Sequence, residues 1–182
     1  MQIENEQLVK DLLRLTDNVT ERVQQLKKLD ATLLNHKETA EKWSVLECIE
    51  HLNMYGDFYL PEIERRILAQ KPVAKPPAFK SGVLGNYFAN MMRADGKKMK
   101  TMKDKNPANS TLTMTTIDRF LKQQDRLGHL LTQAQNIDLT RTRTAISISS
   151  FIKLRLGDTF RFLIYHIDRH VQQAERAAGI RK

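Results

Sequence analysis

Histidine is the residue type in this sequence best suited to chemistry, and one pair of histidines has a spacing that suits a shared task. The sequence contains His36, His51, His129, His166 and His170. His166 and His170 lie four residues apart in a segment with helical periodicity, so their rings point the same way, one turn apart. Two imidazoles at this spacing can hold one metal ion. Taken alone, such a pair more commonly consists of two core or surface histidines that bind no metal.

The residues next to this pair in the sequence argue against one kind of metal site, that of the zinc proteases. Zinc proteases that use the same helical spacing place a glutamate directly after the first histidine, whereas here Ile167 follows His166. The protease form is therefore disfavoured. Asp168 and Arg169 are expected on a solvated face of the helix. Gln173 is a candidate hydrogen-bond partner for His170, of the kind that orients metal ligands.

A third metal ligand must come from another helix, and His51 is the best candidate. Three imidazoles leave at least one coordination position for water or substrate, which distinguishes a catalytic metal site from a closed structural one. Cys48 lies within reach of such an ion, although a lone helical cysteine is more commonly a small core residue. Glu47 is a candidate general base, and a helix-capping role explains it equally well. Tyr55 is a candidate substrate contact. Read alone, His51 is also compatible with an ordinary core or surface histidine.

Four segments with helical periodicity must position these residues. They cover about residues 4–29, 44–69, 115–135 and 157–179, with apolar side chains recurring at steps of three and four residues. Ser44 and Glu47 form the pattern of a capping box at the start of the second helix. Pro61 predicts a kink or a short interruption inside it. Asp158 is the expected N-cap of the last helix, and Gly179 its expected stop signal.

The connections between these helices differ in length. Residues 71–80 contain three prolines and are expected as an extended loop, and residues 81–105 are weakly helical. Residues 145–156 alternate with period two, which is typical of a short strand or an extended connector. Since they have no obvious pairing partner, we expect extended chain packed on the helices. The predicted fold is all-α: a four-helix bundle with a long crossover between its second and third helices. The whole chain, 1–182, forms a single domain in this prediction, with a partly helical insertion at about 71–107.

Two stretches of the chain resemble a known family. Residues 43–52, WSVLECIEHL, resemble the Trp-Ser…His-Leu signature of the DinB/YfiT-like superfamily. Residues 154–173, LRLGDTFRFLIYHIDRHVQQ, resemble the closing His-x-x-x-His helix of the same family, which is followed by a glutamine. The resemblance covers both ends of the predicted bundle in the same order, and it is weak between about residues 71 and 145.

The resemblance implies a four-helix bundle that binds one divalent metal ion through His51, His166 and His170. Imidazole ligands suit zinc, nickel, iron and copper, and zinc or nickel is the expected ion. Members similar to this chain are described as metal-dependent hydrolases, and better-understood relatives are transferases or isomerases that use low-molecular-weight thiols. Family members often form homodimers, so a homodimer is expected here too.

Composition and charge exclude several other classes. The 182 residues contain a single cysteine, which rules out internal disulfides and an all-thiolate metal site. The polar N-terminus lacks a signal-peptide core, and no apolar run reaches the roughly 18 residues of a spanning helix, so a cytoplasmic protein is expected. The net charge of +9 is a general indication of nucleic-acid binding. However, no segment resembles a nucleic-acid recognition motif. The basic residues form one dense cluster, and the others are spread along the chain. The cluster consists of Lys97, Lys98, Lys100, Lys103 and Lys105.

The leading hypothesis is therefore a metal-dependent enzyme that hydrolyses a small molecule or transfers a thiol to it. The metal would lower the pKa of a bound water or thiol and so generate a nucleophile. The first alternative is a non-catalytic metal-binding or interaction protein, which would have the same sequence pattern. A basic nucleic-acid-binding protein is the less favoured alternative. The insertion at 71–107 is expected to act as a lid over the site or to form a dimer surface.

Overall fold

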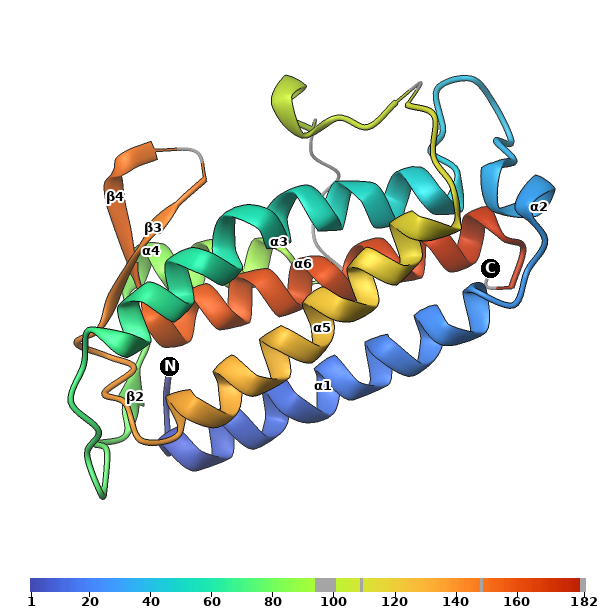
Figure 1. Ribbon diagram of the computed structural model, residues 1–182. Helices are drawn as coiled ribbons and strands as arrows, with labels where there is room; N and C mark the ends of the chain where they lie inside the picture. Colours follow the sequence, from blue (N-terminus) through green and yellow to red (C-terminus); the bar gives the residue numbers. More distant parts are fainter. Residues whose placement is uncertain (94–100, 109, 148, 181–182) are drawn as a thin grey trace.

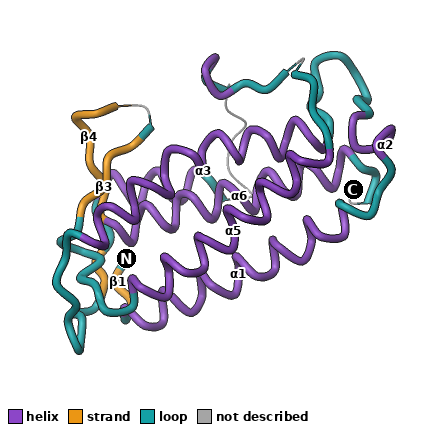
Figure 2. Tube along the Cα trace, in the orientation of Figure 1, coloured by secondary structure: helices purple, strands orange, loops and turns teal. Residues whose placement is uncertain are grey.

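Four long helices dominate the computed structural model, which describes residues 1–93, 101–108, 110–147 and 149–180. They lie side by side, as Figure 1 and Figure 2 show. They are α1 (Asn5–Leu26), α3 (Val45–Leu68), α5 (Met114–Ala134) and α6 (Leu156–Ala177). The predicted all-α class is confirmed, and each long helix lies within a few residues of its predicted position.

The four helices enclose one core. α1 packs against α5 and α6, and α3 packs against the same two helices. Each helix contributes its apolar stripe, and the buried side chains form a single cluster, with fully buried members such as Val19, Ile49, Phe120 and Phe160. Removing these stripes from water is the main force that holds the helices together.

The start of α3 agrees with the prediction in detail. The Ser44 hydroxyl accepts a hydrogen bond from the Glu47 backbone N–H, and the Glu47 carboxylate accepts one from the Ser44 backbone N–H. This capping box sets where the helix begins, and hence which way its later side chains point. The interruption expected at Pro61 is absent, because α3 continues through it. Buried Leu60 and Ile63 on either side pack into the core, and this packing compensates for the backbone hydrogen bond that proline cannot donate.

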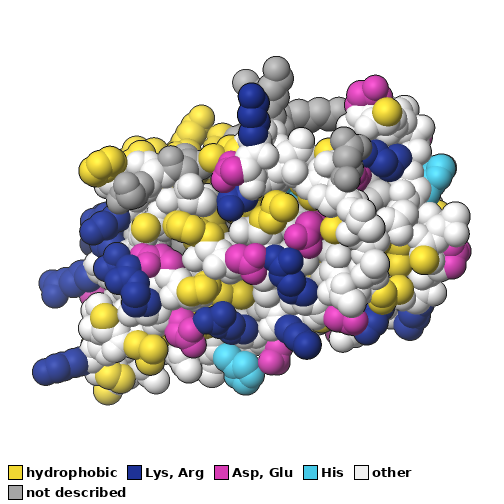
Figure 3. Space-filling view, turned by 45° about the horizontal axis from the view of Figure 1, so that its top comes forward, with side chains coloured by type: hydrophobic (Ala, Val, Ile, Leu, Met, Phe, Trp, Pro, Cys, Tyr) yellow, Lys and Arg dark blue, Asp and Glu magenta, His cyan; other side chains and the backbone are white. Residues whose placement is uncertain are grey.

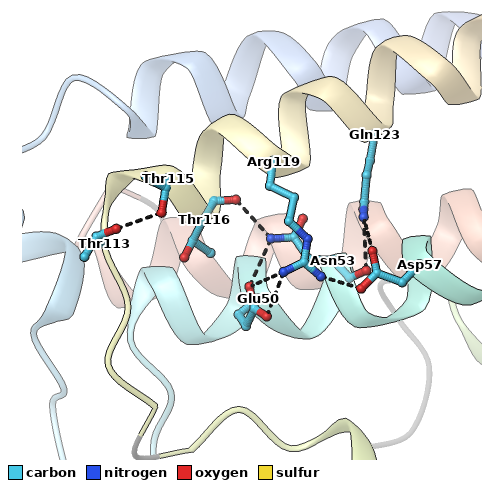
Figure 4. A network of polar contacts seen from close by, with 8 residues as sticks. All are labelled: Glu50, Asn53, Asp57, Thr113, Thr115, Thr116, Arg119 and Gln123. Atoms are coloured by element: carbon cyan, nitrogen blue, oxygen red, sulfur yellow. Dashed lines mark hydrogen bonds and ion pairs between the residues drawn. The ribbon is translucent and has the colours of Figure 1, made fainter.

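Polar contacts fasten α3 to α5 (Figure 4). The guanidinium of Arg119 on α5 binds the carboxylates of Glu50 and Asp57 on α3. The buried Asn53 amide donates to the Thr116 carbonyl, 3.0 Å away. Glu50 and Asn53 flank the candidate ligand His51, so these bonds fix the rotation of α3 at the position that matters for the site.

Short elements complete the structure. They are β1 (Gln2–Ile3), α2 (Ala31–Asn35), β2 (Phe79–Lys80), α4 (Val83–Met91), a 3-10 turn η1 (Lys103–Lys105), β3 (Arg143–Ile146) and β4 (Ser149–Arg155). β1 pairs with β2, so the N-terminus is joined to the start of the insertion. None of the helices in the described ranges has the length and apolarity that crossing a bilayer requires.

The prediction for residues 145–156 was wrong in one respect, because this segment does have a pairing partner. β4 pairs antiparallel with β3, in register from Arg143 opposite Arg155 to Ala145 opposite Lys153, with a shift after Ala145. The partner immediately precedes it in the chain. The connection at 147–148 is Ser-Ile rather than the glycine or asparagine that mark a tight hairpin, so no turn signal was present in the sequence.

The expected N-cap of α6 was also wrong, whereas its expected end is correct. α6 begins at Leu156, and Arg155 occupies the cap position. Asp158 lies inside the first turn, where its buried carboxylate accepts hydrogen bonds from the Ser81 hydroxyl and the Gly82 N–H and pairs with Arg161. Asp158 therefore attaches the insertion to α6. Gly179 adopts a φ of 71°, the left-handed conformation that ends helices.

Candidate metal centre

Three histidines from two helices meet at one point in the structure. The ring centroid of His51 on α3 lies 5.1 Å from that of His166 and 4.5 Å from that of His170, both on α6. The rings of His166 and His170 are 4.6 Å apart. One ring nitrogen from each residue lies within 4.8 Å of the other two. The two helices thus bring together the three side chains that the sequence singled out.

The spacing of the donor atoms fits a metal ion. The Nε2 atoms of His51 and His166 are 3.2 Å apart. In a tetrahedral zinc site, nitrogens about 2.0–2.1 Å from the ion lie roughly 3.3 Å from one another. Imidazole nitrogens are ligands for zinc, nickel, iron and copper alike, so the donor set does not select among these ions.

Hydrogen bonds orient two of the rings. Nδ1 of His51 lies 2.7 Å from the backbone carbonyl oxygen of Lys105, and Nδ1 of His170 lies 3.0 Å from the side-chain oxygen of Gln173. Both oxygens can only accept, so each Nδ1 carries the proton and each Nε2 keeps its lone pair for the centre. The expected role of Gln173 as a partner of His170 is confirmed. Nδ1 of His166 is buried and has no hydrogen-bond partner within the described residues.

Burial keeps the three imidazoles uncharged at neutral pH. Loss of hydration lowers the pKa of His51 to about 4 and that of His170 to about 3. It also lowers the pKa of His166 well below its ordinary value, and the proximity of the other two rings adds to this effect. Neutral imidazole is the form that binds metals, so no proton has to leave these residues when a cation arrives at pH 7.

Aromatic side chains surround the three histidines. The Trp43 ring lies 4.9 Å from that of His51, and the Tyr55 ring lies 4.5 Å from that of His166. Phe162 stacks on His166 with nearly parallel planes, at 6.0 Å. Burial raises the pKa of Tyr55 to about 12, so its hydroxyl stays protonated and can donate a hydrogen bond.

The structure shows which of the roles considered for Glu47 and Cys48, two other candidates near His51, their contacts support. Both carboxylate oxygens of Glu47 are engaged: one accepts from the Ser44 backbone and the other from Lys37, 3.1 Å away. The capping role therefore accounts for Glu47. Cys48 is fully buried in the hydrophobic core, and burial raises the pKa of its thiol. Cys48 acts as a core residue and lies outside the histidine cluster.

Asp168 and Arg169 do not lie on a simple solvated face, and here the prediction was wrong. Asp168 forms an ion pair with Arg22 of α1 at 2.7 Å. Arg169 lines the cavity next to the histidines and donates to the carbonyl oxygens of Met91 and Arg93. Residues 83–93 cover this side of α6, a tertiary contact that the helical pattern of α6 does not reveal.

A cavity of about 980 Å³ opens onto the three histidines. Its walls come from α3, α6, the β3–β4 hairpin, the segment before α3 and the insertion. Phe88, Met91, Met92 and Met102 of the insertion contribute apolar side chains. In its described parts the insertion therefore forms part of the wall beside the site, while its roles as a lid or as a dimer surface stay predictions. No local pattern in the sequence marks these four residues as part of the site, because only the tertiary fold turns them toward the histidines.

The sequence matches the family model of the DinB superfamily over residues 12–174. The matched region contains all three histidines and the four long helices except the ends of α1 and α6. The chain belongs to the DinB superfamily. Neither the curated proteins nor the solved structures contain a match to it.

Proposed function

We propose that this protein is a metal-dependent enzyme that binds one divalent ion through His51, His166 and His170 and acts on a small molecule. The observation that carries the proposal is the convergence of three ring nitrogens within 4.8 Å of one another. They lie at the wall of a cavity large enough for a small-molecule ligand. Membership of the DinB superfamily supports a metal at this place.

Two reaction classes fit best: hydrolysis of a small molecule, or transfer of a thiol to it. A divalent ion supplies Lewis-acid chemistry, since it lowers the pKa of a coordinated water or thiol and generates a nucleophile at neutral pH. The protein's own residues position this chemistry. Lys105 and Gln173 hold two of the rings in the ligating tautomer. The protonated hydroxyl of Tyr55 can donate to a substrate oxygen, and Trp43 and Phe162 line the cavity beside the histidines with aromatic rings.

A small-molecule substrate is better supported than nucleic acid. On the face drawn in Figure 3, acidic side chains are interspersed among the basic ones, whereas a surface that follows a phosphate backbone concentrates positive charge. Lys97, Lys98 and Lys100 of the basic cluster lie outside the described residues. The expected homodimer and the cytoplasmic location stay predictions.

Elemental analysis of the purified protein tests the metal site. We expect about one zinc or nickel ion per chain in the wild type and strong depletion in His166→Ala and in His170→Ala. His129→Ala is the matched control, because the His129 side chain is exposed and lies next to Asp125 on α5. Retention of metal in both ligand variants would remove the site from consideration.

Assays of ester hydrolysis and of thiol transfer to small electrophiles test the catalytic part separately. We expect one of these activities in the metal-loaded protein and its loss in His166→Ala. A fully loaded protein with neither activity would contradict an enzyme of these classes and favour the alternative of a non-catalytic metal-binding protein.

A further inference from the structure

The walls of the cavity change character along α6. One face of this helix carries Phe162, His166, His170, Gln173 and Arg176 in succession, and all five line the cavity. An α-helix rises about 1.5 Å per residue, so Phe162 lies about 6 Å along the axis to one side of His166. Arg176 lies about 9 Å beyond His170 on the other side. The histidines therefore stand between an apolar end and a polar end.

Side chains from α3, the β3–β4 hairpin and α4 join Phe162 of α6 at the apolar end. Tyr59 of α3 packs its ring 5.7 Å from that of Phe162. Ile146 of β3 and Leu154 of β4 are buried and line the cavity there. Phe88 of α4 also lines the cavity, while Tyr87 next to it is 62% exposed and does not. This end lies toward the β3–β4 hairpin, at the left of Figure 1.

Hydrogen bonds hold α4 alongside this half of α6. Arg161 donates to the side-chain oxygen of Asn86 at 3.1 Å, and Arg169 donates to the carbonyl of Met91, also at 3.1 Å. Because Phe88 lies between Asn86 and Met91 in α4, these contacts place it beside the stretch of α6 between Arg161 and Arg169. The apolar wall formed by α4 is therefore anchored at both of its ends.

The opposite end of the cavity is polar and charged. Besides Gln173 and Arg176 it includes Gln172 and the segment before α3, with Glu38, Glu41 and Lys42. Trp43, next to His170, and Ala177 are the apolar residues among them. Glu38 and Lys42 pair with each other. An extended apolar group placed at this end would remove these groups from water without compensation, which is unfavourable.

We infer that the substrate carries an apolar group, an alkyl chain or an aromatic ring, that extends from its reactive centre toward Phe162, Phe88 and the hairpin. This inference rests on the proposed function for the position of the reactive centre at the histidines. The apolar group would exchange water for the side chains of Tyr59, Phe88 and Phe162, and its burial stabilises the complex in proportion to its area. The substrate is thus elongated, with its polar part directed toward Arg176.

Straight-chain hydroxamates test this inference, because they present one metal-binding head group with a variable apolar chain. Calorimetric titration of the zinc-loaded protein with acetohydroxamate, butanohydroxamate and octanohydroxamate should show affinity rising by about two- to four-fold per added methylene. Equal affinity for the three ligands would overturn the inference.

The same titrations on metal-free protein keep the two proposals apart. Removal of zinc should weaken all three ligands and preserve the advantage of the longer chain. If the ligands bound the zinc-free protein as tightly as the loaded one, the proposed metal function would fail. The dependence of affinity on chain length would still show whether the cavity binds an apolar group.

Residues on α4 supply a cavity variant and its matched control. Phe88→Gln should weaken octanohydroxamate about ten-fold and change acetohydroxamate by less than about two-fold. Val83→Gln, on the same helix but 95% exposed and outside the cavity, should change neither. Leu154→Thr, a second position at the apolar end and on the hairpin, should likewise weaken octanohydroxamate more than acetohydroxamate, which guards against misfolding of a single variant. Equal losses in the Phe88 and Val83 variants, or no loss in both cavity variants, would overturn the inference.

Discussion

Nδ1 of His51 lies 2.7 Å from the backbone carbonyl oxygen of Lys105, 54 residues further along the chain. The segment that helps to cover the cavity thus also orients one of the three histidines. Because a backbone carbonyl accepts hydrogen bonds regardless of side chain, no substitution at position 105 removes this contact directly. The corresponding contact of His170 is with a side chain, Gln173, and can be tested by mutation.

Gln173→Ala should weaken metal binding without abolishing it. Loss of the Nδ1 partner frees the His170 ring to rotate and change tautomer, and such losses typically cost 10- to 100-fold in metal affinity. Competition with a chromophoric chelator measures the change. Gln173→Glu, which keeps an acceptor, should retain most of the affinity.

Gln172→Ala is the control for this pair, because the neighbouring amide bonds to Asp168 rather than to a histidine. Its metal affinity should match the wild type. Equal affinities in Gln173→Ala and Gln172→Ala would show that Gln173 does not position His170.

Chelation of the metal should lower thermal stability and leave the helices folded. An ion at 100 times its dissociation constant adds about 2.7 kcal/mol to the free energy of unfolding. For a chain of this size, that corresponds to a fall of roughly 5–10 °C in Tm. Thermal melts followed by far-UV circular dichroism, with and without chelator, measure both quantities.

The core of the protein explains why folding should survive chelation. The apolar cluster spans all four long helices and depends on no ion. Chelator should leave the Tm of His166→Ala unchanged, since that variant has no ion to lose. A complete loss of helical signal in the chelated wild type would refute this view of the core.

Local patterns pointed to the residues of the candidate site, and the family resemblance joined His51 to the pair of His166 and His170. The four-residue spacing of His166 and His170 fixes their common direction on any helix. The Ser44–Glu47 capping box sets where α3 begins, and with it the direction of His51. Side-chain type and helical geometry carry this information within a few residues, so it can be read without the tertiary fold.

Long-range contacts could not be predicted in the same way. The acceptor for His51 is a backbone atom, which has no signature in the sequence. Asp158 has the residue type of an N-cap, yet its carboxylate accepts from Ser81 and Gly82, far away in the chain. The position of Arg169 in the cavity wall depends on where residues 83–93 lie, and their weak helical pattern did not predict that they would pack against α6.

The ion pair of Asp158 and Arg161 should be one of the most sensitive points of the fold. Both side chains are almost fully buried, at 0% and 3% exposure. Asp158→Ala would leave the Arg161 charge buried and uncompensated, which typically costs about 3–5 kcal/mol in the free energy of unfolding. Urea denaturation measures this cost, and in the double variant with Arg161→Ala the cost should fall below the sum of the two single variants.

Asp11 and Arg14 form the matched control pair, because they have the same three-residue spacing on an exposed helix face. Asp11→Ala should change the free energy of unfolding by less than about 1 kcal/mol, as is usual for surface pairs. Additive costs at Asp158 and Arg161 would contradict a coupled buried pair.

Glu62 should make the attachment of the β3–β4 hairpin dependent on pH. Burial by itself raises the pKa of Glu62, but hydrogen bonds from the Ala145 backbone, Arg66 and Arg65 outweigh this effect and hold the pKa below its ordinary value. A carboxyl group with a lowered pKa in the folded state contributes stability that is fully present above its pKa in the unfolded chain. That contribution is lost as the pH falls through the lower pKa of the folded state.

Comparison of the wild type with Glu62→Gln isolates this charge, because glutamine keeps an oxygen that can accept from Ala145. Between about pH 5 and pH 8 the wild type should be more stable by about 1 kcal/mol, and the difference should shrink as the pH falls below about 4. Urea denaturation across this pH range measures the difference. Because Ile146 and Leu154 of the hairpin form part of the cavity wall, a difference that stays constant down to pH 3 would mean that the Glu62 charge does not hold this wall in place.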